Sequence, residues 1–337
     1  MNTILVTGGL GYIGSHSVVQ LLNKDYDVVI CDNLSNSYEK VFSGIKTITG
    51  KSPRFYKTDV RDTAAMLQLF KQEPTISGII HFAALKAVGE SVEHPLRYYD
   101  NNVNGLIQLL KSLPDHRSIS LVFSSSCTVY GEPEQLPIDE SAPIKPATSP
   151  YGYTKQVCEN ILSDSAKVND HLRVISLRYF NPIGAHPSGI IGELPIGKPN
   201  NLIPFVTQTA AGMHQELVVF GDDYDTRDGT CIRDYIDVID LADAHILALE
   251  RLFEFKNSYE VFNLGTGTGS TVLEVIQAFE QVNQVKLPYR IGPRRAGDVI
   301  QIFADNTKSK KILGWEPTTP LEVSLKNAWN WQQKLKA

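Results

Sequence analysis

The stretch that decides the fold is Thr3-Ile-Leu-Val-Thr-Gly-Gly-Leu-Gly-Tyr-Ile-Gly14. Its first five residues are an apolar, β-branched run typical of a buried strand, and residues 15–23 have the composition of a helix. Glycine allows φ > 0 and a close approach of backbone to a ligand, and a helix N-terminus attracts phosphate through its free N–H groups. A strand, a glycine-rich turn and a helix in this order indicate a dinucleotide site, although the spacing is GxxGxxG and not the usual GxGxxG.

A second apolar run, residues 28–31, ends at Asp32, eighteen residues after Gly14. An acidic side chain at this strand end is placed to bond the adenosine ribose 2′-hydroxyl of NAD. Asn33 follows, and no arginine stands beside it to hold the 2′-phosphate of NADP. We therefore expect NAD as the cofactor. The alternative is a tight turn followed by an exposed loop aspartate.

Composition excludes several classes of protein. The 337 residues are 42% hydrophobic and 20% charged, with a net charge of −5, which argues against a nucleic-acid binder and against docking on an anionic membrane. No apolar run approaches the ~18 residues of a membrane span, and the chain enters a strand without room for a signal peptide. The four cysteines lack metal-ligand spacing, so we expect reduced thiols, a cytoplasmic location and no metal.

Strands and helices alternate through the first 180 residues, which predicts a parallel sheet with helices on both faces. The expected strands are 3–7, 28–31, 54–57, 78–84, 119–124 and 172–179, and a long helix is expected over 95–113. Clusters of Pro, Gly and Asn at 181–189 and 197–201 predict loops. Further strands are expected at 217–220, 259–264 and 289–291, and helices near 238–252 and 270–282.

The predicted fold class is therefore α/β, a doubly wound parallel Rossmann sheet with a smaller C-terminal substrate-binding lobe. Residues 1–180, with a return near 237–265, are expected to form the NAD-binding domain, and 181–337 mainly the lobe. Ligands of such sheets sit beyond the carboxyl ends of the strands.

Tyr151 and Lys155 lie four residues apart at the start of a predicted helix, so they share one helical face. A neighbouring ammonium and a positively charged nicotinamide both favour phenolate, which would lower the pKa of Tyr151 from its usual value near 10 and make the phenol a usable acid or base. Ser126, twenty-five residues earlier, follows the strand 119–124 and would face the same crevice. A solvated Tyr/Lys pair and a polar strand end are the alternatives.

Taken together, these motifs resemble those of the extended short-chain dehydrogenase/reductases, and among them the UDP-glucose 4-epimerase family. The segments that carry the resemblance run through nearly the whole chain: TGGLGYIGSH (7–16), CDNLSNS (31–37), HFAALKAVGES (81–91), YYDNNVNG (98–105), SSSCTVYGE (124–132), SPYGYTK (149–155), LRYFNPIGAHPSG (177–189), PNNLIP (199–204), DGTCIRDYI (228–236), NLGTG (263–267) and RRAGDV (294–299).

The resemblance implies a role for each matching position. Ser126, Tyr151 and Lys155 would be catalytic. Positions expected to bind NAD are Gly8, Gly11, Tyr12, Ile13, Gly14, Asp32, Asn33, Asn36, Ser37, Asp59, Val60, Phe82, Ala83, Lys86, Asn101, Ser124, Tyr151, Lys155 and Tyr179. Positions expected to bind the sugar nucleotide are Ser126, Tyr151, Phe180, Asn181, Asn201, Leu202, Phe220, Arg233, Arg295, Asp298 and Ile302.

The implied reaction is reversible C4 epimerisation of UDP-galactose and UDP-glucose through a 4-keto sugar, as in galactose metabolism. Ile302 stands where the family gates the 2-substituent of the hexose, and its size is expected to favour these substrates over N-acetylated UDP-hexosamines. The other candidates are a sugar-nucleotide dehydratase or reductase and a non-catalytic NAD-binding protein. The dehydratases carry Asp-Glu where this chain has Cys127 and Thr128. A homodimer is expected from the resemblance, with contacts through the helix over 95–113 and the helix after Tyr151.

Overall fold

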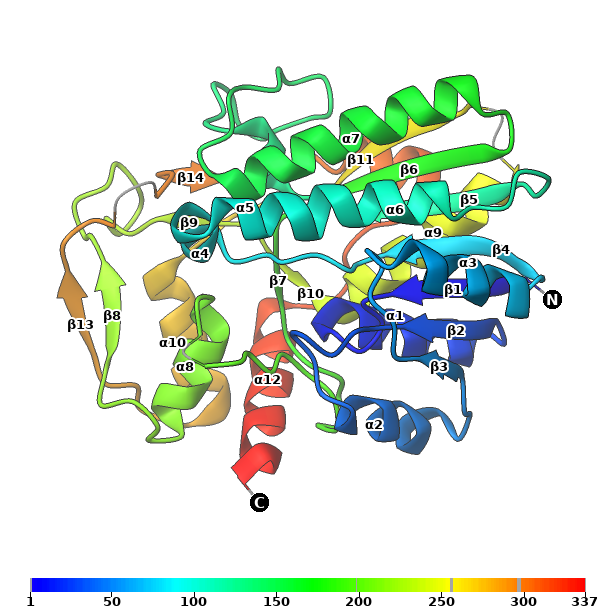
Figure 1. The fold of residues 1–337 in the computed structure, drawn as a ribbon. Coiled ribbons are helices and arrows are strands. Elements are labelled where there is room, and N and C mark those ends of the chain that lie inside the picture. Colours follow the sequence, from blue (N-terminus) through cyan, green and yellow to red (C-terminus); the bar gives the residue numbers. More distant parts are fainter. Residues whose placement is uncertain (1, 198, 255–256, 296–297, 337) are drawn as a thin grey trace.

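The computed structural model describes residues 2–197, 199–254, 257–295 and 298–336 (Figure 1). Ala296 and Gly297 of the segment 294–299, and Lys198 of the predicted loop 197–201, lie outside the described residues.

Within the described residues, seven parallel strands form the central sheet, in the order β11-β6-β5-β4-β1-β2-β3 (Figure 1). Their bounds are β1 Thr3–Thr7, β2 Asp27–Cys31, β3 Arg54–Tyr56, β4 Ile76–His81, β5 Ile119–Ser124, β6 Leu172–Tyr179 and β11 Tyr259–Leu264. Strands β2 and β3 are added on one side of β1. Strands β4, β5, β6 and β11 follow on its other side. The predicted doubly wound α/β fold is confirmed, and its switch point lies between β1 and β4.

Both faces of the sheet are buried, which is why its strands are almost continuously apolar. Successive strand residues point to opposite faces, so Ile4 and Val6 join one apolar core and Leu5 the other. The first core includes α1 (Tyr12–Asn23), α2 (Lys40–Thr49), α9 (Val238–Glu254) and the end of α11 (Thr307–Leu313). The second includes α3 (Thr63–Gln72), α6 (Gly105–Lys111) and α7 (Pro150–Val168).

Two of the predicted helices differ in detail. Helix α1 begins at Tyr12, inside the glycine motif and earlier than predicted. The long helix expected over 95–113 is a helical run made of α5 (Pro95–Tyr98), a π-helical turn (Tyr99–Asn104) and α6, and a short helix α4 (Val88–Glu93) precedes it. Helical periodicity predicts such a run, but it does not reveal the extra residue that a π turn accommodates.

The C-terminal part supplies a separate apolar core from α8 (Leu202–Ala210), α10 (Val272–Asn283), α12 (Leu321–Lys336) and β8 (Leu217–Phe220). β8 pairs with β13 (Tyr289–Gly292), and these elements lie beyond one end of the sheet in Figure 1. Short strands complete the C-terminal part: β7 (Asn181–Ile183), β9 (Ile232–Arg233), β10 (Tyr235–Asp237), β12 (Ser270–Thr271) and β14 (Gln301–Ile302). β7 forms where only a loop was expected, because β10 pairs with it. The division into domains at residue 180 remains a prediction.

Candidate functional site

The pockets open where the central strands end. One cavity of about 500 Å³ and an adjoining one of about 90 Å³ share the residues that follow β1 and β4, including Gly8 and Phe82. Every position that the sequence assigned to NAD lines one of the two. The larger is lined by Gly8, Gly11, Tyr12, Ile13, Gly14, Asn36, Ser37, Phe82, Lys86, Ser124, Tyr151, Lys155 and Tyr179, and the smaller by Asp32, Asn33, Asp59, Val60, Ala83 and Asn101 as well.

The glycine turn is a cradle that side chains would fill. Gly8 has φ +69°, and a Cβ there would lie 2.8 Å from the backbone nitrogen of Ala83. A Cβ on Gly14 would lie 2.2 Å from the carbonyl oxygen of Gly8. Among the described residues, none caps the start of α1 with a side chain and no acidic residue stands in its first turn. The uncapped N–H groups and the helix dipole therefore present an anion site, which fits the diphosphate of a dinucleotide.

Asp32 is positioned by donors on both of its oxygens. Its Oδ2 accepts from the backbone N–H of Leu10 at 3.0 Å, and its Oδ1 accepts from the N–H of Leu34 at 2.9 Å and from the hydroxyl of Ser37 at 2.8 Å. A carboxylate has about four acceptor sites, so one remains for a ribose hydroxyl.

Asp59 lies across the smaller cavity from Asp32 and receives a hydrogen bond from the amide of Asn33 at 2.8 Å. Hydrogen bonds from the Arg61 guanidinium, assisted by its charge, lower the pKa of Asp59 to about 2. The smaller cavity is therefore lined by two aspartate side chains and by amides, which suit ribose hydroxyls and base edges, and the ionised Asp59 would repel a 2′-phosphate.

The catalytic candidates meet beneath the larger cavity. Tyr151 is the second residue of α7, whose N-terminus is capped by the hydroxyl of Ser149 and begins with proline. One turn later, Lys155 donates from Nζ to the carbonyl oxygen of Ser124 at 2.6 Å, and this ammonium lies 5.9 Å from the centre of the Tyr151 ring. The Ser124 hydroxyl is 2.6 Å from that of Tyr179. The ends of β5 and β6 thus hold the start of α7 against the site.

Burial dominates the protonation of this pair. It raises the pKa of the Tyr151 phenol well above 10, and a hydrogen bond with Ser126 offsets only part of that rise. It lowers the pKa of Lys155 to about 8. The sequence predicted a lowered pKa for Tyr151, and the chain's own groups produce the opposite shift because removal from water penalises the phenolate. An additional positive charge beside the ring is needed to reverse it.

A buried ion pair supports the same strand ends from below. Glu159, one turn after Lys155, accepts from the Arg178 guanidinium at 2.6 Å and 2.9 Å and from the hydroxyl of Ser125 at 2.6 Å. Both partners are more than nine-tenths buried. Because each charge is paired and hydrogen-bonded, the network fixes the register between α7, β5 and β6.

The predicted sugar-nucleotide positions are only partly in the larger cavity. Tyr151 and Asn201 line it, and the other predicted positions do not. Phe180 and Ile302 pack in one apolar cluster with Cys127, and Ile302 pairs with Arg233 across β14 and β9.

Beyond that cluster, Asp298 lies between two arginines. Its Oδ1 is 2.7 Å from Arg295 and 3.5 Å from Arg233, and the Arg295 guanidinium stands 5.5 Å from the ring of Phe220. Of the remaining positions, Leu202 begins α8, and the Asn181 N–H donates to the carbonyl oxygen of Asp234 at 2.9 Å. These contacts connect Phe180 and Ile302, through Arg233, Asp298 and Arg295, with the exposed ring of Phe220. The roles of the individual residues remain predictions.

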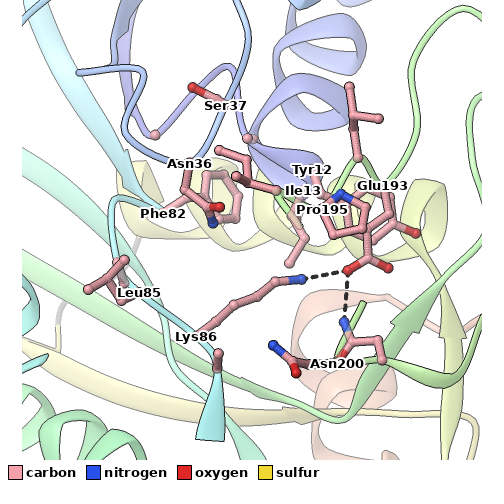
Figure 2. A pocket seen from close by; sticks show the side chains of 18 of the residues that line it. Tyr12, Ile13, Asn36, Ser37, Phe82, Leu85, Lys86, Glu193, Pro195 and Asn200 are labelled. Atoms are coloured by element: carbon pink, nitrogen blue, oxygen red, sulfur yellow. Dashed lines mark hydrogen bonds and ion pairs between the residues drawn. The ribbon is translucent and has the colours of Figure 1, made fainter. Parts of the chain in front are cut away.

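Sequence reasoning missed a residue in the wall of the cavity. Glu193 accepts from Lys86 Nζ at 2.7 Å and from the amide of Asn201 at 2.8 Å, on the same oxygen. Figure 2 shows Lys86 extended across the cavity with its ammonium pointing at Glu193, and Pro195 on the same segment as this glutamate. No local pattern around residues 190–195 marks a site, because the contact depends on two loops that are 107 residues apart.

This chain is similar over nearly its whole length to one family model and to several curated and solved proteins. The family model described as GDP-mannose 4,6 dehydratase matches residues 5–328. The UDP-glucose 4-epimerase of Bacillus subtilis is 51% identical over 329 residues, covering 98% of this chain and 96% of the relative. The solved UDP-glucose 4-epimerase of Stenotrophomonas maltophila, with bound NAD and formylated UDP-arabinopyranose, superposes with a TM-score of 0.96 at 48% identity, covering 100% and 99% of the two chains. The Bifidobacterium longum enzyme, in complex with NAD+ and UDP, gives 0.94 at 46% identity, covering 99% and 98%.

Proposed function

Because the chain belongs to the family of UDP-glucose 4-epimerases, we propose that its pocket interconverts UDP-galactose and UDP-glucose with Tyr151 as the proton-transferring group. The protein is an NAD-dependent isomerase. The observation that supports the assignment of Tyr151 is its convergence with Lys155 and Ser126 next to a glycine cradle and an uncapped helix N-terminus.

NAD fits the two cavities along their length. The start of α1 receives the diphosphate, Asp32 the adenosine ribose, and Lys155 the nicotinamide ribose. When bound, NAD accepts and returns the hydride at C4 of the sugar. Tyr179 and Ser124 are buried in the wall of the larger cavity beside Tyr151 and Lys155.

The chain's own residues move the proton. Ser126 hydrogen-bonds the 4-hydroxyl oxygen, and Tyr151 takes its proton and later gives it back. A phenol with a pKa far above 10 cannot do this at neutral pH, so the reaction needs the positive charges of Lys155 and of a bound nicotinamide beside the ring. The ammonium of Lys155 is mainly protonated at pH 7, because burial lowers its pKa only to about 8.

The diphosphate and uracil of the substrate bind along the path into the lobe. Arg233 and Arg295 offer guanidinium donors that match phosphate oxygens, and Asp298 orients both arginines. Phe220 is exposed and offers its ring face to a base. Anchoring at this end leaves the hexose free to turn and present either face of its C4.

Elimination of water, the chemistry named in the family model's description, lacks its acid and base here. Cys127 and Thr128 follow Ser126, and burial raises the pKa of the Cys127 thiol to about 12, so that it stays protonated. Thr128 has no ionisable group. The N-acetylhexosamine alternative is also disfavoured, and Ile302 supports the same preference because it is a branched side chain buried against Phe180.

The test is Tyr151→Phe with Tyr153→Phe as the matched control. Both are on α7, but Tyr153 is 49% exposed. We expect Tyr151→Phe to lose about 10²–10⁴ in turnover of UDP-galactose while it still binds NAD, and Tyr153→Phe to keep wild-type turnover. Wild-type turnover by Tyr151→Phe would exclude the mechanism. Activity of the wild type that is greater on UDP-N-acetylgalactosamine than on UDP-galactose would exclude the role of Ile302.

We further propose a cytoplasmic homodimer whose protomers join through α4, α5 and α7. Val88, Val92 and Leu96 are exposed and spaced four residues apart, and Tyr153 adds an exposed ring nearby on α7. Burying this stripe against a second copy removes apolar surface from water. The four cysteines are free and buried, as in a reducing compartment. None of the described helices has the length and apolar character to cross a bilayer.

A further inference from the structure

Glu193 is a carboxylate in the wall of a cavity that has to accept anionic diphosphates. Its side chain is 11% exposed, and its oxygen Oε1 receives hydrogen bonds from Lys86 at 2.7 Å and from Asn201 at 2.8 Å (Figure 2). Lys86 comes from the loop after β4, on the cofactor side, and Asn201 from the N-cap of α8, on the nucleotide side. One oxygen atom therefore joins the two halves of the cleft.

The backbone of Glu193 is itself held in place. Its carbonyl oxygen accepts from the indole of Trp331 on α12 at 3.0 Å. A Cβ on the preceding Gly192 would lie 2.5 Å from that indole, so the segment is packed directly on the ring. Gly184 lies earlier in the same loop, and its carbonyl oxygen accepts a hydrogen bond from the hydroxyl of Tyr12 at 2.7 Å. Helices α1 and α12 thus fix the loop from both sides.

We propose that Glu193 is a positioning residue that holds the Lys86 ammonium for the cofactor diphosphate and the Asn201 amide for the nucleotide. This inference rests on the proposed function of the pocket. Lys86 Nζ lies 5.7 Å from the ring of Tyr12, the first residue of α1, and so next to the anion site. Its side chain is 45% exposed, and an unpaired lysine there would sample many rotamers.

The charges in this arrangement are balanced. A lone carboxylate would repel the phosphates, but the pair with Lys86 is neutral and leaves the other ammonium hydrogens free to donate. The Asn201 amide donates to Glu193 through one of its two hydrogens. Its remaining hydrogen and its carbonyl oxygen take no part in that bond and can bond a ligand. Neither effect requires Glu193 to contact the reacting atoms.

Two variants of the holoenzyme separate the two contacts of Glu193 Oε1, the one with Lys86 and the one with Asn201. Glu193→Gln removes the charge that holds Lys86 but keeps an acceptor for Asn201, and Glu193→Ala removes both. Glu260→Gln is the matched control. Glu260, in strand β11, also accepts hydrogen bonds from one lysine, Lys308 at 3.0 Å, and from one asparagine, Asn257 at 2.8 Å. The readouts are the rate at which the protein loses NAD to charcoal and the Kd of UDP measured by calorimetry.

We expect Glu193→Gln to lose NAD about fivefold faster with UDP affinity near that of the wild type. Glu193→Ala should show the same loss of NAD and bind UDP about tenfold more weakly. In both, kcat/KM should fall more than kcat. Wild-type behaviour of either variant, equal weakening of UDP by Gln and Ala, or the same effects in Glu260→Gln would overturn the proposal.

None of the binding readouts requires turnover. Failure of the proposed function would instead be seen as full turnover by Tyr151→Phe, so the two failures are distinguishable. Circular dichroism and the unfolding midpoint of each variant verify that the fold is intact, and Glu193→Gln, which keeps the shape of the side chain, serves if Glu193→Ala does not fold.

Discussion

Replacing Gly14 with alanine tests whether the contact between backbones in the glycine turn creates the cofactor site. Gly14 is the third residue of α1, where alanine by itself would favour the helix by about 0.8–1 kcal/mol. In this protein the added Cβ would lie 2.2 Å from the carbonyl oxygen of Gly8 and 2.9 Å from Cα of Gly9. Both obstacles are backbone atoms, so no side-chain rotation can relieve them.

The magnitude follows from those two distances. An ordinary contact at this position is about 3.4 Å, so the turn and the helix must separate by roughly 1 Å, and overpacking of this kind costs about 1–3 kcal/mol. After the gain in helix propensity, we expect a net loss of up to about 2 kcal/mol in the free energy of unfolding. The N–H groups at the start of α1 move with the turn. Weakening their bonds to a charged diphosphate costs about 1.5–3 kcal/mol, or roughly 10- to 100-fold in NAD affinity.

The assay pairs urea denaturation with the NAD content of the purified protein. Gly89→Ala is the control, because Gly89 is also near the start of a helix, α4, and a Cβ there meets nothing within 4 Å. The control should keep NAD and gain up to about 1 kcal/mol. If Gly14→Ala retained NAD with wild-type affinity and unfolded at the wild-type urea concentration, the backbone approach could not be what forms the site.

Two further outcomes test the surface and the core. Leu96→Glu, at a position 80% exposed on α5, should convert the proposed dimer to a monomer in light scattering, whereas Leu67→Glu, also exposed but on α3, should not; a monomeric wild type would refute the interface. Burial lowers the pKa of His81 to about 3, so the unfolded chain takes up this proton below about pH 6.5 and the folded protein does not. The stability contributed by His81 is therefore complete above pH 6.5 and should fall by about 1.4 kcal/mol per pH unit between about pH 6.5 and pH 3. Urea titration of His81→Asn should show a slope smaller by that amount, because the buried His16 and His245 keep their own contributions.

Much of the central sheet could be predicted because its signals are local. Strands buried on both faces read as short apolar runs, and the observed bounds of β1, β5, β6 and β11 match those predicted. The order of strands and helices then implied the switch point, and with it the edge at which the cofactor residues would gather. The resemblance to the epimerase family then assigned positions as distant as Gly8, Asp32 and Asn101 to one cleft, and all three line the smaller cavity.

Strands β8 and β13 and helix α10 of the C-terminal lobe were predicted, but its shortest strands and helix α8 were not, for a physical reason. Strands β9, β12 and β14 have two residues each, and each exists only because a partner distant in sequence pairs with it. Helix α8 begins at Leu202, directly after a run of Pro and Asn residues that predicts a loop, and it contains Pro204. Proline is tolerated in the first turn of a helix, so the sequence is compatible with this helix but does not predict it.

Tyr151 and Lys155 show a different limit of sequence reasoning. Their proximity was predicted and is observed, but the folded chain alone shifts the pKa of Tyr151 in the direction opposite to the predicted one. The spacing of Tyr151 and Lys155 predicts contact between a phenol and an ammonium, but it carries no information about how completely α7 and β5 remove both from water. Because both side chains are buried, desolvation outweighs their attraction. The Lys155 ammonium donates a hydrogen bond to the carbonyl oxygen of Ser124. It follows that the folded chain alone holds Tyr151 protonated, and that its acidity depends on the charge that occupies the neighbouring cavity. The proton transfer proposed for Tyr151 would therefore require bound cofactor.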